Sequence, residues 1–141
     1  MDWVLDSSIA LALALPDETS EQTDRFFGRI TRGSVLWVPA LWWYEMINAL
    51  IGAQRRKRLT ETDRMRLIEL YRMLPIQTDT ILDPDAMHRF HTLAVEHELS
   101  AYDAAYLELA QRKGLGLATL DQRLHSAALR AGVKVAFRKG I

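Results

Sequence analysis

The chain has 141 residues, of which 49% are hydrophobic and 26% charged, and 18 basic and 18 acidic side chains give a formal net charge of zero. This length and composition predict a single domain over residues 1–141 with a substantial core. A neutral balance argues against a protein that holds nucleic acid mainly by its overall charge. The absence of cysteine excludes disulfides and thiolate metal sites.

No run of eighteen apolar residues suggests a membrane span, and the N-terminus lacks a basic start followed by a cleavage site. We therefore expect a cytoplasmic protein without a membrane partner.

Short apolar runs bounded by Gly, Pro or Asp predict strands in this chain. Longer segments with helical periodicity lie between them. The predicted strands are Trp3–Leu5 and Val35–Val38, with weaker ones at Leu115–Ala118 and Val133–Phe137 and a short candidate at Pro75–Thr78. The predicted helices are Glu18–Ile30, Ala40–Gln54, Thr60–Leu74, Pro84–His97, Ala101–Lys113 and Asp121–Ala131.

Buried strands that alternate with helices predict an α/β fold, a three-layer α/β/α sandwich with a mostly parallel sheet of four to five strands. Ligands of such sheets bind outside the carboxyl ends of the strands. Asp6 follows the first predicted strand, Asp121 follows the strand at Leu115–Ala118, and Asp103 begins the helix before that strand.

Each of these aspartates also has a local explanation. Asp6 could cap a helix that begins at Ser7, and Asp121 could cap the helix that follows it. Ser100 and Asp103 have the spacing of a capping box.

Glu45 has no such explanation, because it lies well inside the helix of the segment PALWWYEMINALIGA. A buried glutamate needs a cation, strong hydrogen bonds or a proton. Glu45 could meet solvent at a gap or pair with an arginine from elsewhere. Alternatively, it faces a site that it shares with the three aspartates.

Four converging carboxylates would form a site of hard oxygen ligands, and their mutual repulsion favours a bound cation. Such ligands suit Mg²⁺ or Mn²⁺. The chemistry this predicts is metal-assisted hydrolysis of a phosphodiester.

Four segments in order carry a family resemblance: VLDSSIAL at the start, an E-x-x-N-A-L helix at Glu45, SAYDAAYLELA from Ser100, and LATLD ending at Asp121. With them the chain resembles PIN-domain ribonucleases, specifically the VapC toxins of bacterial toxin–antitoxin pairs. The resemblance spans nearly the whole chain.

The resemblance implies an acidic metal cluster for Mg²⁺ or Mn²⁺, with Asp6 and Asp103 as direct ligands. Its four catalytic and metal-binding residues would be Asp6, Glu45, Asp103 and Asp121.

Three neighbours would support this cluster. Ser8 and Thr119 would act around the metal or the scissile phosphate, or else cap local backbone. Asn48, one turn after Glu45, would orient that carboxylate. Many members carry an acidic or amide residue shortly after the last aspartate, where this chain has Gln122 and Arg123. The number of metal ions therefore stays open.

The resemblance further implies endonucleolytic cleavage of RNA, inhibition by a cognate antitoxin whose peptide enters the acidic site, and a homodimer. Apolar surface near Trp42, Trp43 and Ile47 is a candidate dimer interface. The alternative is a PIN-like binding module without catalysis. A phosphatase or receiver domain fits less well, because the former would require an aspartate where Ser8 stands.

Two further patterns have ordinary explanations. His88 and His91 lack a third zinc ligand at a usual spacing, so a solvated helix face is expected. The basic run at residues 54–58 is expected to be a solvated helix end, with phosphate contact as the alternative.

Overall fold

The computed structural model describes residues 1–15, 21–30 and 32–137. Its centre is a parallel sheet with strand order β3-β2-β1-β4. The strands are β1 (Trp3–Leu5), β2 (Leu36–Pro39), β3 (Ile76–Asp79) and β4 (Gly116–Ala118).

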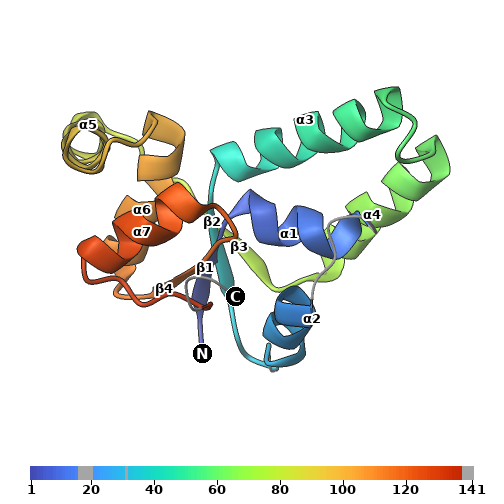
Figure 1. Cartoon of the computed structure of the whole chain (residues 1–141), viewed down its shortest axis with the longest axis horizontal. Helices are drawn as coiled ribbons and strands as arrows, with labels where there is room; N and C mark the ends of the chain where they lie inside the picture. Colours follow the sequence, from blue (N-terminus) through green and yellow to red (C-terminus); the bar gives the residue numbers. More distant parts are fainter. Residues whose placement is uncertain (16–20, 31, 138–141) are drawn as a thin grey trace.

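Seven helices in the described residues cover the two sides of this sheet. Figure 1 shows α1 to α4 on one side and α5 to α7 on the other, as expected for an α/β/α sandwich. No helix in the described residues is long and apolar enough to span a bilayer. The helices are α1 (Ser7–Ala14), α2 (Glu21–Gly28), α3 (Leu41–Arg55), α4 (Glu61–Met73), α5 (Pro84–His97), α6 (Ala101–Lys113) and α7 (Gln122–Arg130).

Local sequence signals placed most helix ends correctly. Thr60 and Asp63 form the predicted capping box of α4, and Gly132 follows α7 with a φ of +76°, which a glycine adopts readily. The predicted helix Glu18–Ile30 appears as α2, while its residues 18–20 lie outside the described ranges.

The expected strand at Val133–Phe137 is wrong in extent, because only Val135 forms a bridge with Leu117. In a parallel ladder, successive residues direct their N–H and C=O groups to opposite neighbours. All residues of β4 are in register with β1, but the N–H and C=O groups of Leu117 face away from β1. Its N–H donates to Lys134 O at 2.8 Å and its C=O accepts from Ala136 N at 3.1 Å. Because β4 is so short, Leu117 alone offers its N–H and C=O groups on the outer edge, and a single bridge forms there.

The core lies between the sheet and both helical layers. Fully buried side chains include Leu5 and Leu36 of the sheet, Ile9 of α1, Trp42 of α3 and Leu107 of α6. Burying a large apolar side chain stabilises the fold by roughly 1.5–3 kcal/mol. These contacts fix the ends of β1, α3 and α6, from which polar groups project.

Gly116 allows the outer strand to approach β1 closely. A Cβ at this position would lie 2.4 Å from Cζ3 of Trp3, which is far below van der Waals contact. Glycine is therefore required for the Trp3 ring to cross β4.

Candidate functional site

The site lies at the carboxyl ends of β1 and β4, where the strand order changes direction. The chain runs outward from β1 through β2 to β3, and then returns to place β4 on the other side of β1. This switch point is where open parallel sheets bind ligands.

Asp6 comes directly after β1 and is buried, with 5% of its surface exposed. It occupies the N-cap position of α1, but its side chain makes no capping hydrogen bond, so the capping explanation is wrong for this residue. Instead, Oδ2 accepts hydrogen bonds from Ser8 Oγ and Thr119 Oγ1, both at 2.7 Å. The partner Thr119 comes from beyond β4, 113 residues away in sequence.

Ser8 and Thr119 also hold the backbone of the loop after β4. Ser8 Oγ accepts from Leu120 N at 2.9 Å, and Thr119 Oγ1 accepts from Asp121 N at 3.0 Å. Thr119 therefore holds local backbone, as one of the two alternatives predicted, whereas Ser8 holds backbone that is 112 residues away in sequence. The loop is thereby fixed relative to Asp6. A role for either hydroxyl around a metal or phosphate stays a prediction.

Glu45 projects from the second turn of α3 and is partly buried. Its Oε1 accepts a 2.5 Å hydrogen bond from the hydroxyl of Tyr106, which is itself fully buried. Within the described residues, Glu45 forms no ion pair with an arginine. The partner that compensates for its burial is a phenol on α6.

Asp103 and Asp121 are held at the starts of two helices. Asp103 lies in the first turn of α6, where its backbone N–H donates to Ser100 Oγ at 3.1 Å. Asp121 caps α7, because its Oδ1 accepts from Leu124 N at 2.9 Å. The capping explanation is thus correct for Asp121, which is exposed and keeps its second oxygen free of that bond.

Electrostatic coupling shows that the structure brings the four acids together. Burial, the largest cause, raises the pKa of Asp6, Glu45 and Asp103. Neighbouring charges raise these pKa values further. Asp121 raises the pKa of Asp6, and Asp6 and Asp103 raise that of Glu45. Asp121 and Asp6 raise the pKa of Asp103. Four elements separated in sequence therefore place their carboxylates in one electrostatic field.

Hydroxyl donors and one cation oppose this rise. The hydrogen bonds from Thr119 and Ser8 lower the pKa of Asp6, and that from Tyr106 lowers the pKa of Glu45. Arg123 lowers the pKa of Asp103 by its charge. These groups favour the ionised acids without neutralising them.

The donor set fits a hard divalent cation. Both hydroxyls donate to Oδ2 of Asp6, and no side chain of the described residues donates to its Oδ1. Yet no three Asp, Glu or His side chains in the described ranges are arranged so that together they could hold a metal ion. Mg²⁺ needs fewer, since it binds through one or two carboxylates and retains several waters.

Tyr106, which lies in the segment SAYDAAYLELA, was not singled out as a site residue from the sequence. It lies three residues after Asp103, so both project from the same face of α6. That spacing was the available signal. Asn48 is exposed and forms no hydrogen bond with Glu45 in the described structure, so its orienting role stays a prediction.

Trp42 does not belong to an exposed apolar surface, because it is fully buried. It packs edge-on against Trp43 and Tyr71. Trp43 and Ile47 are exposed by 37% and 50%, so the candidate dimer surface is reduced to these and their neighbours.

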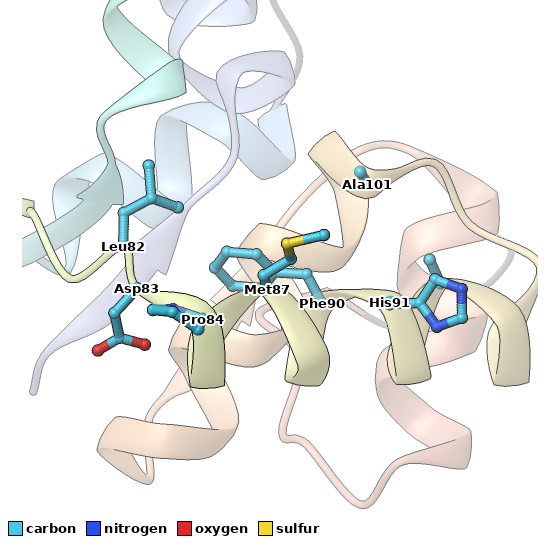
Figure 2. A pocket seen from close by; sticks show the side chains of 8 residues that line it. Leu82, Asp83, Pro84, Met87, Phe90, His91 and Ala101 are labelled. Atoms are coloured by element: carbon cyan, nitrogen blue, oxygen red, sulfur yellow. The ribbon is translucent and has the colours of Figure 1, made fainter.

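A groove of about 560 Å³ along α5 is apolar and distinct from the acidic site. Figure 2 shows Leu82, Met87 and Phe90 around it, with His91 at one side. Asp83 lines its end but caps α5, accepting from Ala86 N at 2.7 Å. His88 and His91 are both exposed, which agrees with the expected solvated helix face.

Known proteins are similar to this chain in sequence and in fold. The family model described as "PIN domain" matches residues 3–129. Ribonuclease VapC3 of Pyrobaculum aerophilum is 33% identical over 128 residues, which cover 88% of this chain and 92% of that protein.

Two solved structures have the same fold. PAE2754 from Pyrobaculum aerophilum matches with a TM-score of 0.69 and 26% identity, covering 96% of this chain and 84% of that one. A toxin–antitoxin complex from Klebsiella pneumoniae matches with a TM-score of 0.62 and 20% identity, covering 96% and 98% of the two chains. With residues 3–129 matched and a VapC relative similar along most of its length, the chain belongs to the PIN-domain family and is a VapC-type member of it.

Proposed function

We propose that the protein is an Mg²⁺-dependent endoribonuclease that hydrolyses phosphodiester bonds of RNA and acts as the toxin of a toxin–antitoxin pair. The observation that carries the proposal is the coupling of four carboxylates from four elements at the switch point of the sheet. The name of the relative, a ribonuclease, supports RNA as the substrate.

Asp6 and Asp103 would hold the metal, and Mn²⁺ could replace Mg²⁺ because both prefer oxygen ligands. The chemistry that such an ion would supply at these residues is polarisation of a phosphoryl oxygen, a lowered pKa of water and stabilisation of the leaving oxygen. Burial in a fixed hydroxyl network keeps Asp6 in one position, so the carboxylate needs no reorganisation during the reaction.

Glu45 and Asp121 have distinct roles in this proposal. Tyr106 holds Glu45 by one oxygen, which leaves the other to orient a water or a hydroxyl of the substrate. Asp121 uses Oδ1 to cap α7 and is exposed, so its Oδ2 can accept a proton from water at the edge of the site.

An antitoxin and a second copy of the chain are the proposed protein partners. A solved structure with the same fold is a toxin–antitoxin complex, which supports the first of these. A basic antitoxin side chain in the acidic site would neutralise the repelling carboxylates and block the substrate. Exposed Trp43, Tyr44 and Ile47 on one stretch of α3 support the second.

The test is cleavage of a structured RNA by the purified protein with EDTA, Mg²⁺ or Mn²⁺. We expect metal-dependent products that Asp6→Asn and Asp103→Asn each reduce by at least about 100-fold. Glu69→Gln, on the exposed face of α4, is the control and should cleave like the unmodified protein.

No cleavage with either metal, together with normal growth of cells that express the chain alone, would contradict the proposal. It would favour the alternative, a non-catalytic module that binds RNA or protein.

A further inference from the structure

A polar cavity of about 480 Å³ lies between the end of α5 and one face of α7. This volume is within the range of sites that bind small ligands. Every lining residue is polar or charged, in contrast to the groove in Figure 2. The lining residues are His97, Glu98, Gln122, Arg123, Ser126 and Arg130.

Arg123 and Arg130 give this cavity its positive charge. They lie two turns apart on α7, about 10 Å along the helix axis, and both are exposed. Neither forms an ion pair with a carboxylate of the described residues. Guanidinium groups bind phosphate oxygens through paired N–H donors, so two unpaired arginines on one cavity suit a phosphate.

The cavity adjoins the acidic site. Arg123 follows Asp121 by two residues, and its charge is close enough to lower the pKa of Asp103. A strand with one phosphate among the acids would therefore bring a neighbouring phosphate or nucleotide to Arg123.

His97 and Glu98 close the other side of the cavity. His97 has only 7% of its surface exposed, and its Nδ1 is buried without a hydrogen-bond partner in the described structure. His97 therefore forms a largely buried wall of the cavity, and the exposed groups that a ligand would meet belong to Glu98 and α7.

Glu98 has a left-handed backbone, with φ at +55°, and an exposed side chain. A carboxylate beside two arginines suits a nucleotide, whose phosphate is an acceptor and whose ribose hydroxyls are donors. An acidic peptide would gain no attraction from the Glu98 carboxylate, because its own side chains carry the same charge.

The basic run at residues 54–58 is less well placed for this purpose. It lies at the end of α3, and Figure 1 shows that end on the opposite side of the molecule from α7. Arg55 is ten residues beyond Glu45, about 15 Å along the helix.

We propose that the cavity between α5 and α7 is a subsite for an RNA nucleotide next to the scissile bond, with its phosphate bound by Arg123 and Arg130. The proposal rests on the proposed ribonuclease function and adds the path of the substrate strand. It also gives a role to Arg123, which follows Asp121 by two residues.

The test measures binding of a fluorescent single-stranded RNA by anisotropy in EDTA, across a series of KCl concentrations. The variant Arg123→Gln with Arg130→Gln should bind about tenfold more weakly, with a slope of log affinity against log salt that is smaller by about 0.7 for each phosphate that no longer pairs with an arginine. The matched control, Arg55→Gln with Arg56→Gln, should change affinity less than twofold. Substitutions of exposed residues such as these change stability little, and thermal unfolding of each variant verifies this.

Cleavage kinetics of Arg130→Gln provide a second readout that leaves the charge beside Asp103 in place. We expect KM to rise about five- to tenfold with kcat unchanged, because Arg130 would bind the RNA equally before and during the reaction.

Unchanged RNA affinity and salt slope in the double variant would overturn the subsite, as would an equal loss in the control pair. So would a polyglutamate peptide that binds the unmodified protein and not the double variant while RNA binding is unaltered, since that identifies an acidic protein partner. A third outcome separates the two proposals. If the double variant loses salt-dependent RNA binding but the unmodified protein cleaves no RNA, the result supports the subsite and contradicts the nuclease function.

Discussion

At the scale of single residues, the role proposed for each acid depends on which group compensates for its burial. Asp6 has two hydroxyl donors and Glu45 has a phenol, and these donors are neutral. Hydrogen bonds to a carboxylate hold its position while leaving its charge available. Tyr106 is therefore a positioning residue for Glu45.

Replacing Tyr106 with Phe should remove that hydrogen bond and retain the packing of the ring. We expect RNA cleavage to fall about 10- to 100-fold, as when groups that orient metal ligands are removed, and stability to fall by about 1–2 kcal/mol. Steady-state kinetics over a range of Mg²⁺ concentrations and urea unfolding measure the two effects.

Tyr71→Phe is the matched control, because the Tyr71 hydroxyl donates to Ala10 O at 2.9 Å in a buried position away from the acids. It should lose similar stability with cleavage unchanged. Equal losses of cleavage in both variants would show that Tyr106 acts only through stability.

At the scale of elements, a partly buried ion network fixes α6 relative to β3. Arg112 donates to Asp79 at 2.6 and 3.2 Å and to Glu108 at 2.7 Å, and Glu108 also accepts from Arg89 at 3.1 Å. The carboxylates of Glu108 and Asp79 raise the pKa of Arg112 further above its ordinary value. Since α6 carries both Asp103 and Tyr106, this network anchors a helix that supplies two groups to the site.

Replacing Arg112 with Met should destabilise the protein by about 3 kcal/mol, because Asp79 and Glu108 would keep buried charges with one partner fewer. Arg72→Met is the control: its pair with Glu69 is exposed on both sides, and such pairs contribute about 0–1 kcal/mol. Urea unfolding curves compare the two. A destabilisation below about 1 kcal/mol for Arg112→Met would mean that the network adds little to stability.

At the scale of the whole molecule, the net charge is zero, yet like charges repel one another among the acids of the site. The pKa values of Asp6, Glu45 and Asp103 are higher in the folded chain than their ordinary values, so the folded state binds more protons than the unfolded state. The stability of the metal-free protein should therefore decrease as pH rises from the ordinary values, 3.8 for Asp and 4.5 for Glu, through the raised ones.

Thermal unfolding in EDTA should accordingly show that Asp103→Asn stabilises the metal-free protein, and more at about pH 8 than at about pH 5. Mg²⁺ at about 100 times its Kd should stabilise the unmodified protein by about 2.7 kcal/mol, a rise in Tm on the order of 10 °C. The variant should gain much less. A Tm independent of Mg²⁺ at the higher pH would contradict binding of the ion at the acids.

The sequence by itself determined most of the helices and strands and the kinds of ligand atom. Periodicity and caps gave the bounds of α5 and α6 and placed β1 correctly, because these signals act between residues a few positions apart. The four acids, in a chain without cysteine, predicted a metal site with oxygen ligands, because the residue types that can supply ligand atoms are read directly from the sequence.

Only the tertiary structure decided what each acid does. Asp6 and Asp121 occupy the same position before a helix, yet Asp121 caps its helix and Asp6 does not. The difference arises because Thr119, 113 residues away, reaches Asp6 when β4 pairs with β1. The partner of Glu45 on α6, and the arginine of α7 beside Asp103, depend on the same packing. The state of a buried charge is set by contacts between distant elements, and local sequence patterns do not contain them.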